Sequence, residues 1–205
     1  METTVTTRKF MNVSRHQIRG TSRQAGFSLL EVLIAGAVIT VGLLAVLGLF
    51  GTALAATQSS QMDEIAHARA TQALESVYTA RETAQLGWDA INNTNVITNN
   101  TPGLFTPGMV ALSDPGNDGL EGTADDVTPP APFILPGPDG ILGTSDDITV
   151  SLKSFQRQIQ ITQATDPNTG ALIPTLKQVV ITVQYPGSNG ANRTYVVQSL
   201  ISQYR

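Results

Sequence analysis

The chain of 205 residues contains no cysteine. This absence excludes thiol nucleophiles, disulfide frameworks and cysteine-based zinc sites. Aromatic residues are also scarce, at 5% of the chain, whereas glycine (18) and proline (11) are frequent. Long stretches of the chain must therefore be turn or loop around a modest core.

Positive charge is nearly absent from the middle of the chain, where no Lys or Arg occurs between Arg81 and Lys153. Residues 1–26 carry five basic side chains and the single acid Glu2, which gives a net charge of +4. Because the whole chain has a net charge of −4, residues 27–205 have a net charge of −8. We do not expect a nucleic-acid partner, because phosphate contacts need Lys and Arg. A basic start followed by an apolar run is instead a targeting pattern.

Catalytic patterns are absent as well. His16 lies in the basic start and His67 on a predicted helix surface, and Ser188 has no nucleophile-elbow context. Walker and dinucleotide-binding motifs are missing. We therefore predict that the protein is not an enzyme and has no certain cofactor.

A membrane-spanning segment is predicted between Val32 and Gly51, where every residue except Thr40 is apolar or glycine. Twenty helical residues rise about 30 Å, the thickness of the hydrocarbon core. The basic start should remain on the cytoplasmic side. An ordinary secretory signal cleaved after Ala55 is the alternative, but its apolar region usually has only about 7–15 residues.

The junction between the basic start and the apolar run carries the most specific motif. It reads Arg23-Gln24-Ala25-Gly26-Phe27-Ser28-Leu29-Leu30-Glu31-Val32-Leu33-Ile34-Ala35. This segment resembles the cleavage and methylation site of type IV prepilins and type II secretion pseudopilins. The resemblance covers residues 23 to about 56 closely and the following helix more loosely.

The resemblance implies that a prepilin peptidase cuts between Gly26 and Phe27 and that the new amine of Phe27 is N-methylated. It implies a single pass through the inner membrane with a cytoplasmic N-terminus before processing, and later a place in a pilus, at the cell surface or in the periplasm. It also implies that the N-terminal helix packs with other pilin subunits. Many major pilins have proline where this chain has Gly48, so the chain looks more like a PilV-like minor pilin or a pseudopilin.

The position of Glu31 in an apolar helix also has a physical explanation that does not depend on the resemblance. A carboxylate in hydrocarbon costs a few kcal/mol unless it is paired. A freshly cut N-terminus, with its positive charge and unpaired N–H groups, would lower this cost if it came from a neighbouring subunit. The alternative is local, because Ser28 and Glu31 also fit a capping box at the start of their own helix.

The rest of the chain predicts an α+β, pilin-like fold in which one long N-terminal helix packs on a small antiparallel sheet. Beyond Thr52 small and apolar residues recur every three or four positions, at Met62, Ala66, Ala70, Ala73, Val77, Ala80 and Ala84, while charged residues including Arg69 mostly take the other faces. Strand patterns follow from Ile148 to Ala164, with a phase slip between Leu152 and Phe155, then around Val179–Tyr185 and from Arg193 to Gln203. We therefore divide the chain into a cleaved leader (1–26), a membrane and filament-core half-helix (27–52), an amphipathic half-helix (53–86), a variable loop region (87–147) and a sheet (148–205).

A duplicated acidic motif lies in the loop region. Residues 115–128 match residues 136–149 at nine of fourteen positions, with a period of 21. The copies place carboxylates at the same spacing, at Asp118, Asp125 and Asp126 and at Asp139, Asp146 and Asp147. Because calcium prefers six to eight oxygen ligands, these residues are candidate calcium ligands. The alternative is a pair of solvated Asp-Gly turns in which each Asp bonds its own backbone.

These patterns favour a structural subunit, a minor or accessory pilin of a type IV pilus. One alternative is a pseudopilin of type II secretion. The other is a membrane-tethered periplasmic calcium-binding module that never polymerises.

Overall fold

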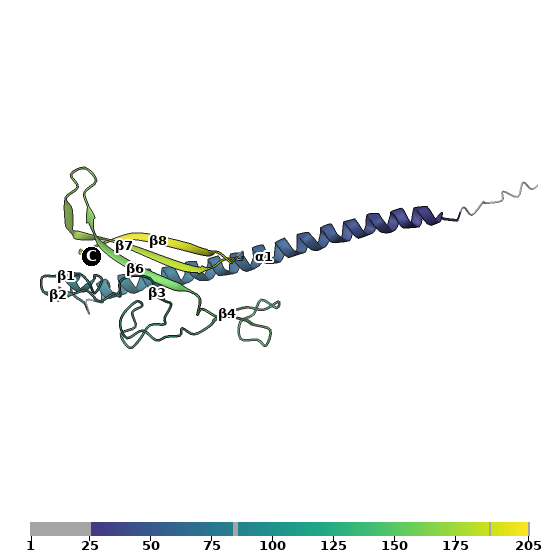
Figure 1. The fold of residues 1–205 in the computed structure, drawn as a ribbon. Helices are drawn as coiled ribbons and strands as arrows, with labels where there is room; N and C mark the ends of the chain where they lie inside the picture. Colours follow the sequence, from purple (N-terminus) through teal and green to yellow (C-terminus); the bar gives the residue numbers. More distant parts are fainter. Residues whose placement is uncertain (1–25, 84–85, 189, 205) are drawn as a thin grey trace, which may run out of the picture. The chain divides into compact units, whose positions relative to one another are not determined.

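The computed structural model describes residues 26–83, 86–188 and 190–204 (Figure 1). The chain divides into two compact units, Met1–Gly48 and Leu49–Arg205. Nearly all of the predicted leader, residues 1–25, and Ala84 of the predicted helical stripe lie outside the described residues.

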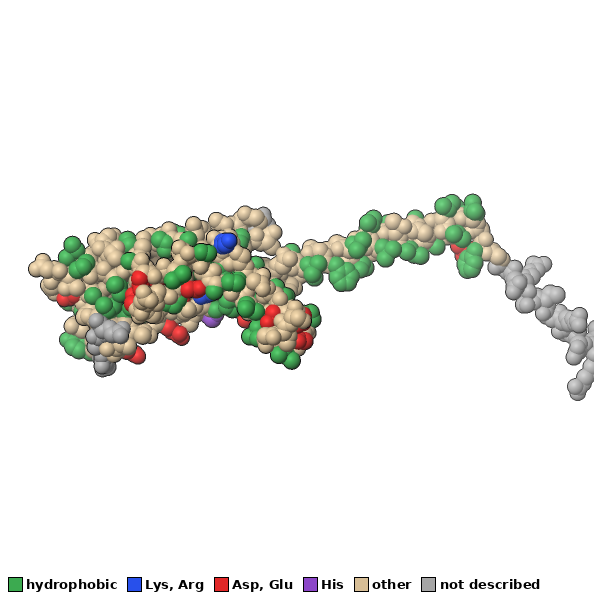
Figure 2. All heavy atoms as spheres, turned by 90° about the horizontal axis from the view of Figure 1, so that it is seen from below, with side chains coloured by type: hydrophobic (Ala, Val, Ile, Leu, Met, Phe, Trp, Pro, Cys, Tyr) green, Lys and Arg blue, Asp and Glu red, His purple; other side chains and the backbone are tan. Residues whose placement is uncertain are grey.

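A single helix, α1 (Leu29–Glu82), begins in the first unit and ends in the second. No proline interrupts it, and its apolar first part is long enough to cross a membrane. All side chains of this part are exposed, and Figure 2 shows hydrophobic groups along it. Such a surface is stable only when lipid or other protein covers it.

In the second unit α1 buries one stripe of small side chains. Ala66, Ala70, Ala73, Val77 and Ala80 are fully buried, as their spacing of three or four residues predicts. These small residues let the helix axis approach the sheet closely. The stripe packs in one core with Ile159, Ile161, Val179, Ile181 and Ile201 from the strands.

The main sheet is antiparallel, with the order β3-β6-β7-β8. Its strands are β3 (Val110–Ala111), β6 (Gln156–Thr165), β7 (Leu172–Pro186) and β8 (Asn192–Ser202). Side chains at alternate positions of β7, from Val179 to Tyr185, are buried against the helix, as the alternation predicts. The α+β, pilin-like fold class is therefore confirmed.

The phase slip predicted between Leu152 and Phe155 is a break between two strands. β5 (Ile148–Val150) ends before it and pairs with β4 (Phe133–Leu135), whereas β6 begins after it. Both Leu152 and Phe155 are buried, and the Phe155 N–H donates to the Leu152 carbonyl at 3.0 Å. The turn thus allows two residues out of strand phase to enter the same core.

Short elements cap the end of the second unit where α1 finishes. They are the 3₁₀ turn η1 (Trp88–Ala90) and the hairpin of β1 (Ile97–Thr98) and β2 (Thr101–Pro102). Asn99 and Asn100 connect the two strands with φ of 51° and 62°, a left-handed conformation that asparagine tolerates in tight hairpins.

Candidate assembly segment and acidic repeats

The start of α1 is fixed by Ser28. Its hydroxyl accepts a hydrogen bond from the Glu31 N–H at 3.2 Å, and its carbonyl accepts one from the Val32 N–H at 3.2 Å. This is the serine half of the capping box that the sequence predicts. Within the described chain, the reciprocal bond, in which the Ser28 N–H would donate to the Glu31 carboxylate, is not formed.

The Glu31 carboxylate therefore does not cap its own helix. Its side chain is exposed in the first turn, and the described residues offer it no hydrogen bond or ion pair. Phe27, one turn earlier, is 81% exposed. The segment thus presents an aromatic side chain and an acid together at the head of an apolar helix.

Glycines along the exposed helix have no role inside the described chain. A Cβ built at Gly36, Gly42, Gly48 or Gly51 meets nothing within 4 Å. Small residues at such positions let membrane helices approach each other closely.

The two acidic repeats share most of their internal hydrogen bonds. In copy 1 (115–128) the Asp118 N–H donates to Asp125 Oδ2 at 3.2 Å and the Thr123 hydroxyl to Asp125 Oδ1 at 2.7 Å. In copy 2 (136–149) the Asp139 N–H donates to Asp146 Oδ2 at 3.2 Å and the Thr144 hydroxyl to Asp146 Oδ1 at 2.6 Å. These bonds lower the pKa of Asp125 and of Asp146, and the threonine hydroxyl is the largest cause in both cases.

Glycine is required at matching positions of the two copies. A Cβ at Gly116 would clash with the Asp125 carbonyl, and one at Gly137 would clash with the Asp146 carbonyl. Gly119 and Gly140 both have a φ of 71°, in the region that favours glycine. The duplication therefore repeats a folded loop as well as a sequence.

Copy 1 is anchored in the core of the second unit. Leu120 is 3% exposed and Glu121 is completely buried. The Glu121 N–H donates to the Ser76 hydroxyl of α1 at 3.1 Å, and its carboxylate forms an ion pair with Arg157 of β6. Copy 1 thus connects the helix to the sheet.

Arg157 is the centre of this contact. Besides Glu121, it contacts Asp126 Oδ2 at 3.4 Å and Ser113 Oγ at 3.3 Å. Burial lowers the pKa of Arg157 to about 10, and the positive charge of Arg69 adds to the effect. Arg157 therefore remains charged at neutral pH and balances the buried acids.

Copy 2 has no such anchor. Ile141 and Leu142, which correspond to Leu120 and Glu121, are 60% and 62% exposed. Among the described residues, the carboxylate of Asp147, which corresponds to Asp126, accepts a bond only from the Gly143 N–H, at 2.7 Å. Its Oδ1 has no hydrogen-bond partner in the described chain.

The candidate calcium ligands of each copy come close together but bond chiefly to their own loop. Asp118 accepts the Leu120 N–H and Asp139 accepts the Ile141 N–H, both at 2.8 Å, which is the turn geometry of the alternative interpretation. Among the residues that the structure describes, no group of three or more Asp, Glu or His side chains is arranged to hold a metal ion. Calcium binding stays a prediction.

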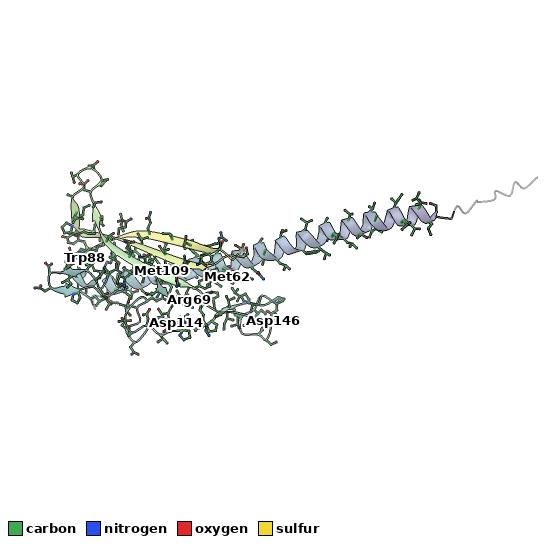
Figure 3. The ribbon with its side chains drawn as sticks, in the orientation of Figure 1. Met62, Arg69, Trp88, Met109, Asp114 and Asp146 are labelled. Carbon is green, nitrogen blue, oxygen red and sulfur yellow. The ribbon has the colours of Figure 1, made fainter. Side chains whose placement is uncertain are left out.

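Three basic residues of the described chain, Arg69, Arg157 and Lys177, are buried although the sequence patterns did not predict it. Arg69, predicted among the outward charges, is buried and pairs with Asp114 at 3.3 Å, and the two are labelled side by side in Figure 3. Arg157 lies at an inward position of β6, where alternation with Ile159 and Ile161 would have indicated it. The alternation indicates an inward Arg but not its partner, because Glu121 lies 36 positions earlier in the chain.

Comparison with known proteins gives one match. Residues 21–55 match the model of the prokaryotic N-terminal methylation motif, which is characteristic of type IV prepilin-like proteins. No curated protein and no solved structure matches the chain. The matched segment contains Gly26, Phe27, Glu31 and the exposed apolar part of α1, so the chain carries the methylation motif that is characteristic of type IV prepilin-like proteins.

Proposed function

We propose that this protein is a minor or accessory pilin of a type IV pilus. Prepilin peptidase cuts it after Gly26, Phe27 is then N-methylated, and α1 anchors the protein in the inner membrane before packing with other pilin subunits. Before cleavage the N-terminus faces the cytoplasm, and after assembly the second unit is displayed on the pilus.

One observation carries the proposal: an exposed, unpaired carboxylate at the head of an apolar helix. Glu31 has no partner in the described chain, and the first turn of its own helix is capped by Ser28. In hydrocarbon, such a charge costs a few kcal/mol unless another group pairs with it. The new amine at Phe27 of a neighbouring subunit has the opposite charge and would fix the axial register of the two helices.

The exposed apolar surface supports the same assignment. Side chains from Leu29 to Leu54 have no protein cover, and the glycines of the segment leave room for a neighbouring helix. A helix that only anchors a protein needs neither the acid nor the glycines, so these features favour the filament over the membrane-tethered module.

The test replaces Glu31 with alanine in cells that assemble the filament. We expect cleavage after Gly26 to continue, because the cut bond and the basic leader are unchanged, while incorporation falls at least about tenfold through loss of the charge pair. Sheared filaments and membranes would be compared by immunoblot.

Glu64→Ala is the matched control, since Glu64 is an exposed acid farther along α1 with no ion pair in the described residues. Incorporation of this variant should be normal. Normal incorporation of Glu31→Ala would contradict the proposed role of the acid. Recovery of the protein in a secretion pseudopilus and not in pili would assign it to the pseudopilins instead.

A further inference from the structure

A pocket of about 650 Å³ lies at the end of the second unit where α1 finishes, between the loop after α1 and strands β6 and β7. Trp88, labelled in Figure 3, forms part of its wall. The volume falls in the range of roughly 300–1,000 Å³ that holds small ligands. Eight of its twelve lining residues are polar or charged, which indicates a polar ligand.

The charges of the pocket are already balanced. Lys177 lies beneath Trp88, with Nζ 4.4 Å from the ring centre, and donates to the carbonyls of Trp88 at 2.6 Å and Ile91 at 2.8 Å. Asp89, the other charged lining residue, accepts a bond from the Asn99 side chain at 3.1 Å. The ammonium is thus occupied by protein acceptors, and the described lining residues offer no free positive charge to an anion.

Uncharged groups supply the remaining hydrogen-bonding capacity. The side-chain amides of Gln163 and Gln203 line the pocket, and within the described chain neither makes a hydrogen bond. Each amide offers both donors and an acceptor. A sugar hydroxyl, which also donates and accepts, matches such groups, and Asp89 and Asn92 add acceptors beside them.

The adjoining sheet edge is too short to favour an extended peptide. The Asn93 side chain covers the edge of β6 by donating to the Ile159 carbonyl at 2.7 Å and accepting from the Ile161 N–H at 2.8 Å. Only residues 162–165 of β6 remain beyond it. An ordinary strand has about 5–6 residues, so the pocket suits a compact ligand better than an added strand.

We propose that this pocket binds a neutral saccharide unit, whose hydroxyls exchange hydrogen bonds with the amides of Gln163 and Gln203 and donate to Asp89 and Asn92. The assignment is independent of the N-terminal segment. It gives the second unit a binding role beyond filament structure.

The single tryptophan of the chain provides the readout, because Trp88 lines the pocket. The mature full-length protein, in a detergent without sugar such as lauryldimethylamine oxide, would be titrated with glucose, galactose, N-acetylglucosamine and N-acetylgalactosamine. We expect at least one to give a saturable change in tryptophan fluorescence with a Kd of about 1 mM. Gln163→Ala should raise that Kd about threefold to tenfold, as expected for one lost hydrogen bond.

Gln198→Ala is the matched control, since Gln198 is an exposed glutamine of β8 outside the pocket, and it should leave the Kd unchanged. No saturable response to any of the four sugars up to about 50 mM would overturn the proposal, because that range covers millimolar affinity. Equal binding of glucuronate would contradict the neutral class. A response to the peptide Thr-Val-Thr-Val-Thr without one to sugars would make the pocket a strand-addition site instead.

Discussion

The two acidic repeats share their glycine turns and most of their internal hydrogen bonds, but they have different surroundings. Residues 120–123 of copy 1 are buried between α1 and β6, although they include the acid Glu121. The matching residues of copy 2 are largely exposed, although they include Leu142. If hydrophobicity alone decided burial, Leu142 of copy 2 would be buried and Glu121 of copy 1 would be exposed. The difference teaches that a buried counter-ion, Arg157, decides which copy joins the core.

The largest effect should come from removing that counter-ion. Arg157→Met leaves the buried Glu121 without its partner, and we expect a loss of about 3–5 kcal/mol in the free energy of unfolding. Denaturant unfolding of the second unit in the full-length protein measures it. Arg157→Met combined with Glu121→Leu, which gives copy 1 the residue of copy 2, should recover most of the loss. No recovery would mean that Arg157 acts through contacts other than this pair.

The next largest difference should appear when the matching apolar residues Leu120 and Ile141 are each truncated to alanine and the losses of stability are compared. Leu120→Ala opens a cavity in the core and should cost about 2–4 kcal/mol. Ile141→Ala removes an exposed side chain and should change stability by less than about 0.5 kcal/mol. The same unfolding measurement serves both variants, and equal losses would show that copy 2 is also packed in solution.

Calcium should have a smaller effect on stability, and its binding allows the carboxylates of Asp126 and Asp147 to be compared. Asp147 Oδ1 has no partner in the described chain, so copy 2 retains a carboxylate oxygen for a cation. If the calcium prediction holds, calcium at ten times its Kd stabilises the bound loop by about 1.4 kcal/mol. Isothermal titration calorimetry of the full-length protein should then show binding that Asp147→Asn weakens more than Asp126→Asn. No heat of binding at millimolar calcium would remove the prediction.

The smallest effect concerns pH, and here the copies should behave alike. The folded pKa values of Asp125 and Asp146 are lowered, so both loops gain stability above the unfolded value of about 3.9 and lose it as the pH falls through the folded values. NMR titration of the Asp118 and Asp139 amide signals should follow the two carboxyls. Thr144→Ala should raise the pKa of Asp146 and leave that of Asp125 unchanged. A change in both pKa values would contradict the independence of the two loops.

Local patterns predicted much of this structure. The spacing of Ala66, Ala70, Ala73, Val77 and Ala80 gave the buried helix face, and the alternation along β7 gave the inward residues of the sheet. The repeat indicated two equal loops, because turn geometry depends on nearby Gly and Asp residues. These features are determined within a few positions along the chain.

Contacts between distant segments could not be predicted in the same way. Arg157 meets Glu121 across 36 positions, and β3 joins β6 through only Val110 and Ala111. Two residues are too short a pattern to indicate a strand. The position of Arg69 on the helix does not indicate that its partner is Asp114, because the two residues are 45 positions apart. The pocket beside Trp88 likewise combines residues from four separate segments, namely 88–99, 161–163, 174–177 and Gln203.

The central claim is that the chain is processed at the methylation motif and assembles through the new N-terminus. Mass spectrometry of the amino terminus of the protein purified from cells tests it most directly. We predict a chain that begins at Phe27 and carries one additional methyl group on its terminal nitrogen. An intact leader, or a chain that begins after Ala55, would contradict the account.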